Sequence, residues 1–217
     1  MAQNIKQAIK REYLKCAQDS VYFMKKYCTI QHPQKGKIKF NLYDFQENTL
    51  KDIIEHRYNI ILKSRQLGIS TLVAGYSLWL MLFNADKNIL CIAKDRDTAK
   101  NLVTKVRVMY SSLPQWLKTV VDEDNKQSLR FANGSQIKAV AATTEAGRSE
   151  ALSLLILDEA AFNDKIDDCK YSNDGLPKEN EIVVVKGRKM DDAVFADIMT
   201  VQDNKVYTKL SDLKKGA

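Results

Sequence analysis

The segment Lys63 to Thr71, KSRQLGIST, has the residue types of a loop that binds phosphate groups. In such a loop, successive backbone N–H groups and the start of the following helix converge on phosphate oxygens. The common form, G-x-x-x-x-G-K-[ST], adds a lysine for the phosphates and a hydroxyl for Mg²⁺. Here Gly68 and Ser70 hold the second glycine and hydroxyl positions, whereas Ile69 stands in place of the lysine.

The missing positive charge is expected at the other end of this loop. Lys63 stands where the first glycine of the common form would be, and it can fold back over the phosphates. Arg65 adds a second cation with planar donors. The loop residues expected to contact a nucleotide are Lys63, Ser64, Arg65, Gln66, Leu67, Gly68, Ile69, Ser70 and Thr71. The alternative is that SRQLGIS is only a polar turn between a strand and a helix.

Two adjacent acids, Asp158 and Glu159, follow the apolar run 154–157. We expect this run to be a buried strand, and ligands of open α/β sheets bind beyond the carboxyl ends of such strands. Asp158 would hold Mg²⁺ together with the Ser70 hydroxyl, and Glu159 would orient or deprotonate an attacking water. The alternative is that Asp158 caps a helix that begins at Glu159.

The elements that position these residues alternate between strands and helices. Apolar and β-branched runs predict buried strands at 58–63, 87–93 and 152–158. Apolar residues at helical spacing predict helices within 4–27, 43–56, 71–83 and 95–113. Asn133-Gly134 predicts a hairpin between two further strands. This alternation predicts an α/β fold with a mainly parallel sheet that is covered on both faces.

The predicted helix at 43–56 has a specific N-cap and a specific buried face. Asp44 is the expected N-cap residue. Phe45, Leu50, Ile53 and Ile54 are the residues expected on the buried face.

Composition excludes several classes of protein. The 217 residues, 45% of them apolar, are enough for one domain with a buried core. No apolar run reaches the roughly 18 residues that span a bilayer, and no signal-peptide segment starts the chain, so we expect a soluble protein. The four cysteines lack metal-ligand spacing. The net charge of +7 favours a polyanionic partner, although many proteins that never bind nucleic acid share such a charge.

Three segments together resemble the ATPase domain of large terminase subunits from tailed bacteriophages: KSRQLGIST, AKDRDTAKNLVTKV and NGSQIKAVAATTEAGRSEALSLLILDEAAF. The resemblance covers about residues 40–164. It implies a RecA-like P-loop NTPase fold with an additional strand, ATP and Mg²⁺ as cofactors, and Lys63 as the phosphate lysine. Members of this family act at the portal of a procapsid and pump double-stranded DNA inward.

The resemblance also implies roles for two residues outside these loops. Arg148 matches an arginine that acts on the γ-phosphate of a neighbouring subunit, and its alternative is a loop charge facing solvent. Gln46 resembles the glutamine that reads adenine in related ATPases, with Phe45 or Tyr43 stacking nearby. The alternative for Gln46 is a solvated residue on an amphipathic helix.

The resemblance further implies partners and a location. The expected partners are double-stranded DNA, the portal protein, the small terminase subunit and further copies of the same chain. The expected location is the host cytoplasm, without a membrane.

The chain departs from the family pattern after residue 168. We therefore expect an N-terminal helical appendage (1–39), an ATPase core (40–168) and an atypical C-terminal segment (169–217). The strand that senses the γ-phosphate and the nuclease domain are not recognisable in this segment, although EIVVVKG and KVYTKL have strand-like composition. An interrupted gene, a split or intein-containing terminase and an unusual short homologue all remain open.

The leading hypothesis is an ATPase motor fragment of a terminase that drives packaging of double-stranded DNA into procapsids. One alternative is a helicase-type ATPase that depends on DNA. The other is a truncated module that binds nucleotide or partners without hydrolysis, because the coupling strand is not recognisable.

Overall fold

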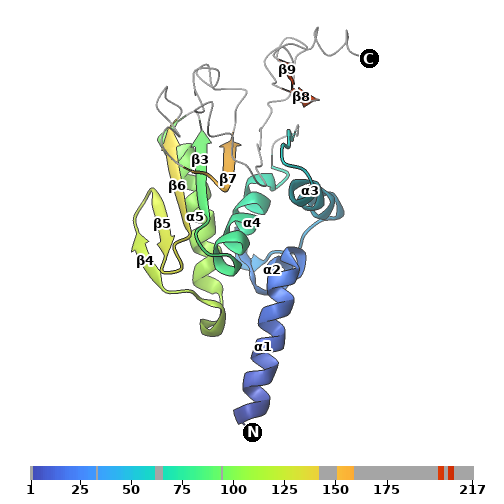
Figure 1. The fold of residues 1–217 in the computed structure, drawn as a ribbon, viewed down its shortest axis with the longest axis vertical. Coiled ribbons are helices and arrows are strands. Elements are labelled where there is room, and N and C mark those ends of the chain that lie inside the picture. Colours follow the sequence, from blue (N-terminus) through green and yellow to red (C-terminus); the bar gives the residue numbers. More distant parts are fainter. Residues whose placement is uncertain are drawn as a thin grey trace.

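The computed structural model describes residues 2–32, 34–61, 66–93, 95–141, 151–158, 200–202 and 205–207. Its central element is a five-stranded sheet with the strand order β4-β5-β6-β3-β7 (Figure 1). The strands are β3 (Asn88–Ala93), β4 (Val121–Asp124), β5 (Ser128–Phe131), β6 (Gln136–Ala141) and β7 (Leu154–Asp158). β6, β3 and β7 run parallel to one another, while β4 and β5 add an antiparallel edge. The predicted α/β fold with a mainly parallel sheet is confirmed.

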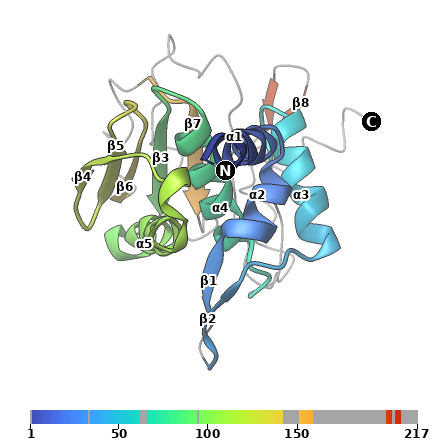
Figure 2. The same ribbon diagram turned by 90° about the horizontal axis from the view of Figure 1, so that it is seen from below.

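Two helices pack against each other, and the second of them packs on the sheet, as Figure 2 shows from below. They are α4 (Ile69–Phe83) and α5 (Arg96–Ser112), which a short 3₁₀ helix, η1 (Gln115–Leu117), follows. α4 is buried over most of its circumference, as expected for a helix without a polar face. The carboxylate of Asp95 caps α5 by accepting a 2.8 Å hydrogen bond from the Thr98 backbone N–H. Both predicted helices are therefore confirmed.

The hairpin predicted at Asn133-Gly134 is also confirmed, because β5 and β6 pair antiparallel across it. Gly134 has φ +84°, in the left-handed region that glycine tolerates best. The Asn133 side-chain amide donates to the Met81 carbonyl at 2.8 Å, which ties this turn to the end of α4.

The N-terminal residues form α1 (Ala2–Gln18), α2 (Ser20–Tyr27), β1 (Thr29–His32) and β2 (Gly36–Lys39). The helices predicted within 4–27 are thereby confirmed. Phe23 and Met24 of α2 are fully buried in the same apolar cluster as α4. Trp79 Nε1 of α4 donates to the Cys16 carbonyl at 2.8 Å. This N-terminal part thus shares a core with the sheet and its helices.

Helix α3 (Asp44–Glu55) lies where a helix was predicted, but two details of the prediction were wrong. Tyr43, not Asp44, is the N-cap residue. Phe45 and Ile54 are 40% and 43% exposed, whereas Leu50 and Ile53 are buried. The buried stripe of α3 is therefore narrow, and Phe45 stacks instead on the exposed ring of Tyr43, with 5.7 Å between centroids.

The strand predicted at 58–63 is not present in its described part, residues 58–61. These residues are not assigned to any strand, and Ile60 is exposed. A β-branched run fits a pleated surface only where a neighbouring strand and a core receive it. Within the described residues, β7 pairs only with β3, and residues 58–61 have no ladder partner.

Beyond the sheet, β8 (Thr200–Gln202) and β9 (Lys205–Tyr207) pair antiparallel with each other. β9 falls inside KVYTKL and confirms a strand there, while EIVVVKG lies outside the described residues.

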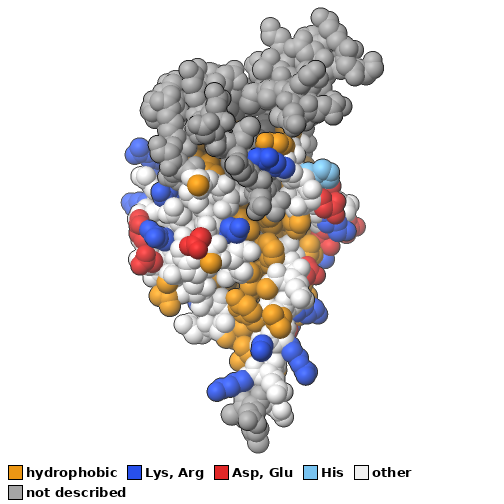
Figure 3. Space-filling view, viewed as in Figure 1, with side chains coloured by type: hydrophobic (Ala, Val, Ile, Leu, Met, Phe, Trp, Pro, Cys, Tyr) orange, Lys and Arg blue, Asp and Glu red, His pale blue; other side chains and the backbone are white. Residues whose placement is uncertain are grey.

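One face of the molecule carries an apolar strip that runs from α4 down along α1 (Figure 3). Ile5, Ile9 and Tyr13 of α1 are exposed, and the Tyr13 ring packs edge-on against Phe83 of α4 at 5.1 Å between centroids. None of the described helices is long and apolar enough to cross a membrane.

Candidate functional site

The loop before α4 and the carboxyl end of β7 lie at the same edge of the sheet. Residues 84–87 alone link the end of α4 to the start of β3, so α4 begins near the edge at which β3 ends. β7 is parallel to β3, and its last residue, Asp158, is paired in register with Ala93. Figure 1 shows the arrowheads of β3, β6 and β7 at this edge. The topology therefore brings the predicted phosphate loop and the predicted acid to one edge, where α/β sheets bind ligands.

The loop reaches α4 through two residues in left-handed conformations. Gln66 has φ +65°, and Gly68, the N-cap residue of α4, has φ +72°. The Gly68 carbonyl accepts hydrogen bonds from the backbone N–H groups of Thr71 and Leu72 at 3.0 and 2.9 Å. The first N–H groups of a helix have no acceptor inside it, so the start of α4 offers donors to an anion.

Ser70 is the predicted Mg²⁺-binding hydroxyl, and its side chain lies buried at the start of α4. The residue is 4% exposed, and its Oγ has no hydrogen-bond partner among the described residues. A buried hydroxyl without a partner costs free energy, which a bound ligand can recover. Ser70 lies in the first turn of α4, next to the helix donors described above.

Ile69 replaces the lysine of the common motif, and its burial shows where the side chain goes. It is 2% exposed and belongs to the apolar cluster of the core. The Ile69 side chain therefore packs inward, and a nucleotide contact by this residue is left to its backbone N–H.

Gln46 of α3 holds the loop in place through both ends of its side-chain amide. Gln46 Nε2 donates to the Leu67 carbonyl at 2.9 Å, and Gln46 Oε1 accepts from the Tyr43 backbone N–H at 3.1 Å. A Cβ atom added at Gly68 would lie 2.7 Å from Gln46 Nε2. Gln46 is 2% exposed, so the alternative of a solvated residue is wrong. The adenine contact stays a prediction, and it would have to share an amide that already has two partners.

Asp158 is the predicted site residue at the carboxyl end of β7. It is 5% exposed at the end of β7, where all five residues are buried. A carboxylate and a hydroxyl are oxygen ligands of the kind that Mg²⁺ accepts beside its waters. Asp158 and Ser70 fit the ion by donor type, although the described residues contain no cluster of three or more metal-ligating side chains.

Five predicted site residues lie outside the described residues: Lys63, Ser64, Arg65, Arg148 and Glu159. Their roles stay predictions.

The clamp by Gln46 was missed at the level of sequence. The spacing Tyr43-x-x-Gln46 carries one usable signal, because a glutamine at the third helical position reaches back to the N-cap N–H in a capping box. The contact with Leu67 spans 21 positions and has no local signal.

No protein-family model matches the chain. Several solved structures do match it. The large terminase of bacteriophage HK97 is 18% identical with a TM-score of 0.66, and the match covers 82% of this chain and 39% of the HK97 chain. The large terminase ATPase domain of Thermus phage P74-26 is 16% identical with a TM-score of 0.51, and the match covers 79% of this chain and 78% of the P74-26 chain. The chain has the fold of a phage large-terminase ATPase domain.

Two further solved structures are similar to this chain in fold. A large terminase from another thermophilic bacteriophage, solved in complex with ADP, is 13% identical with a TM-score of 0.50. It covers 67% of this chain and 38% of its own. Dbp5, a helicase of S. cerevisiae, is 20% identical with a TM-score of 0.50, and the match covers 84% of this chain and 46% of Dbp5. The chain thus spans about two fifths of the HK97 terminase and of the ADP-bound terminase.

Proposed function

We propose that this chain is the ATPase motor part of a viral terminase large subunit, which hydrolyses ATP to drive double-stranded DNA into procapsids. One observation carries the proposal: a buried, unpartnered Ser70 hydroxyl follows left-handed Gly68 at the start of α4 in the described part of the chain. Asp158 lies at the same edge of the sheet. The terminase-like fold and the ADP complex of the thermophilic phage terminase support it.

The proposed chemistry divides the work among the residues of this edge. The N–H groups at the start of α4 bind phosphate oxygens, and Lys63 adds positive charge. Ser70 and Asp158 would hold Mg²⁺, which would neutralise charge on the phosphates. Glu159 accepts the proton of the attacking water. Arg148 of a neighbouring copy of the chain approaches the γ-phosphate.

The partners belong to the proposal as well. Double-stranded DNA, the portal protein, the small terminase subunit and further copies of the chain would complete the motor in the host cytoplasm. The net charge of +7 suits contact with DNA phosphates.

Mg²⁺-dependent ATP hydrolysis by the purified chain, with and without duplex DNA, tests the proposal. We expect Lys63→Ala and Glu159→Gln each to lower turnover by about 100-fold or more. The exposed residues Lys51 and Glu55 of α3 supply the matched controls Lys51→Ala and Glu55→Gln. Turnover that survives both site variants contradicts the proposal. Nucleotide binding by the parent without turnover favours the non-hydrolysing module instead.

The likeness to Dbp5 favours a second candidate, a helicase-type ATPase. A forked DNA duplex with a labelled strand separates the two functions. The packaging motor is expected to hydrolyse ATP without releasing the labelled strand, whereas ATP-dependent release would favour the helicase.

A further inference from the structure

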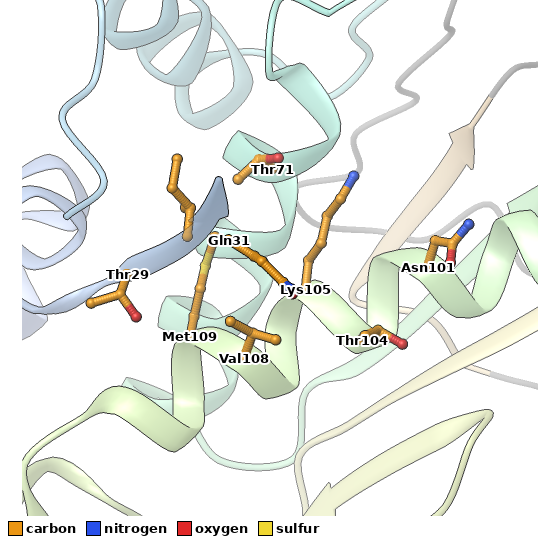
Figure 4. A pocket seen from close by; sticks show the side chains of 9 residues that line it. Thr29, Gln31, Thr71, Asn101, Thr104, Lys105, Val108 and Met109 are labelled. Carbon is orange, nitrogen blue, oxygen red and sulfur yellow. The ribbon is translucent and has the colours of Figure 1, made fainter. Parts of the chain in front are cut away.

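A cavity of about 490 Å³ opens between β1, the first turn of α4 and one face of α5. Its lining residues are Thr29, Ile30, Gln31, Thr71, Asn101, Thr104, Lys105, Val108 and Met109. Figure 4 shows Gln31 reaching from β1 towards Lys105, with Thr71 on the α4 side. The lining combines the apolar side chains of Ile30, Val108 and Met109 with amide, hydroxyl and ammonium groups, and among the described residues it contains no carboxylate. Such a lining suits an anionic ligand rather than a cation.

The strand register places two lysines opposite lining residues of this cavity. In the β1–β2 pair, Thr29 lies opposite Lys39 and Gln31 lies opposite Lys37. Directly opposite residues of an antiparallel pair project from the same face. Thr29 and Gln31 line the cavity, as does Ile30 between them, so Lys37 and Lys39 project from the hairpin face that carries two of these three lining residues. We call the cavity together with this lysine-bearing face the hairpin groove.

The positive charge of the hairpin is not neutralised locally. Residues 29–39 contain three lysines, Lys35, Lys37 and Lys39, and no Asp or Glu. All three lysines are exposed, and none forms an ion pair with a described residue. Figure 2 shows β1 and β2 projecting from the helices on the side away from the sheet. The exposed lysines of this hairpin can therefore contact a large partner.

The geometry points to the hairpin groove as a binding site for the phosphodiester backbone of duplex DNA. Lys37 and Lys39 would contact phosphates from the hairpin and Lys105 from α5, without reading base sequence. Gln31 and Asn101 supply neutral donors of the kind that hydrogen-bond phosphate oxygens. This inference rests on the proposed function in one respect, because duplex DNA is the polyanion that the proposed motor would move.

Thr71 lies between the hairpin groove and the proposed nucleotide site. Thr71 lines the cavity and follows Ser70 in the first turn of α4. A DNA strand in the hairpin groove would therefore lie against the same helix whose first N–H groups are proposed to bind phosphate.

Fluorescence anisotropy with a labelled duplex of arbitrary sequence, about 30 base pairs long, tests the inference. The test variant is the full chain with Lys37→Glu and Lys39→Glu. Its matched control is Lys51→Glu with Lys126→Glu, which changes the net charge equally at exposed lysines of α3 and of the β4–β5 turn. We expect the test variant to bind DNA about 10-fold more weakly than this control. We also expect the slope of log affinity against log salt to fall by about 1 for each lysine.

Two outcomes overturn the inference: a parent chain that binds no DNA, or test and control variants with equal affinities and equal salt slopes. Binding of a fluorescent ADP analogue, measured in parallel, is expected to be the same in both variants and in the parent. If the parent binds DNA through the hairpin but binds no nucleotide, the proposed ATPase function is contradicted and the DNA site is supported. If the parent binds nucleotide but its DNA affinity does not depend on the hairpin lysines, the DNA site is contradicted and the proposed ATPase function is not.

Discussion

Ser70 and Thr71 are neighbours in the chain, but they belong to two regions that are built in opposite ways. On the Ser70 side, the binding groups are buried and fixed by the fold: left-handed Gly68, the clamped amide of Gln46 and the Ser70 hydroxyl itself. On the Thr71 side, the outer wall is an exposed hairpin with lysines. Buried groups that have partners, such as the Gln46 amide, contribute to stability, whereas exposed charges contribute little.

Gly68→Ala is the change with the largest expected effect on this comparison. Its φ of +72° strains any residue with a Cβ, and that atom would lie 2.7 Å from Gln46 Nε2. We expect a loss of about 2 kcal/mol or more in the free energy of unfolding, from backbone strain and the displaced hydrogen bond. Nucleotide affinity should fall with it. Urea denaturation and ADP titration measure the two losses.

Gly36→Ala is the matched control, because Gly36 has φ +67° but a Cβ there would meet nothing within 4 Å. It should cost only the backbone strain, about 1 kcal/mol, and leave nucleotide affinity unchanged. Equal costs for the two substitutions would mean that the contact with Gln46 contributes nothing.

Gln46→Ala has the next largest expected effect and distinguishes the clamp from an adenine reader. It leaves the Leu67 carbonyl and the Tyr43 N–H without their partner, and we expect a loss of about 1–2 kcal/mol in stability. A clamp acts on the phosphate loop, so affinities for ATP and GTP should fall by the same factor. If ATP affinity falls and GTP affinity does not, Gln46 reads the base.

Gln46→Glu refines that result. The carboxylate keeps an acceptor for the Tyr43 N–H but loses the donor to the Leu67 carbonyl. We expect it to weaken nucleotide binding nearly as much as Gln46→Ala does, and a variant with parental affinity would contradict a role for the Leu67 contact.

The same contrast explains what the sequence could and could not predict. The strands at Asn88–Ala93 and Leu154–Asp158 and the helix at Arg96–Ser112 follow from local apolar patterns, and all were predicted. The predicted site residues Ser70 and Asp158 were placed at one edge for the same reason, since parallel strands end together.

The failures occurred where tertiary contacts decide. Phe45 has the spacing of a buried residue, but only a narrow stripe of α3 meets the core. The run at 58–61 has strand composition without a paired neighbour among the described residues. The β1–β2 hairpin and its groove were not predicted, because the cavity depends on residues from three elements far apart in the chain.

A smaller effect is expected from an ion cluster between α1 and α2, away from both regions. Hydrogen bonds from Lys26 Nζ at 2.7 Å and Tyr22 OH at 2.8 Å lower the pKa of Glu12 to about 2. Since the unfolded value is about 4.5, the stabilisation is present above pH 4.5 and is lost as the pH falls towards 2. Glu12→Gln should remove about 1 kcal/mol or less at pH 6, because the carboxyl is partly exposed.

Urea denaturation at pH 6 and pH 3 measures this effect, with Asp97→Asn at an exposed surface pair as the control. The parent should lose more stability between the two pH values than Glu12→Gln does. An equal loss in both proteins would rule out the cluster as a source of pH dependence.

The smallest expected effect on stability is that of Lys37→Glu with Lys39→Glu, within about 0.5 kcal/mol of the parent by urea denaturation. Both side chains are exposed and lie on the projecting hairpin. A loss of stability as large as that expected for Gln46→Ala would contradict the claim that the exposed hairpin lysines contribute less to stability than the buried groups do.

Binding of ADP to Ser70→Ala, measured by titration with and without Mg²⁺, tests the central claim most directly. The Ser70 hydroxyl is buried without a partner among the described residues, so its removal should not lower stability. If this oxygen binds Mg²⁺ beside the nucleotide, the variant should bind ADP about 10-fold more weakly than the parent in Mg²⁺ and equally well in EDTA. Equal affinities of parent and variant in Mg²⁺, or no ADP binding by the parent, would contradict the claim.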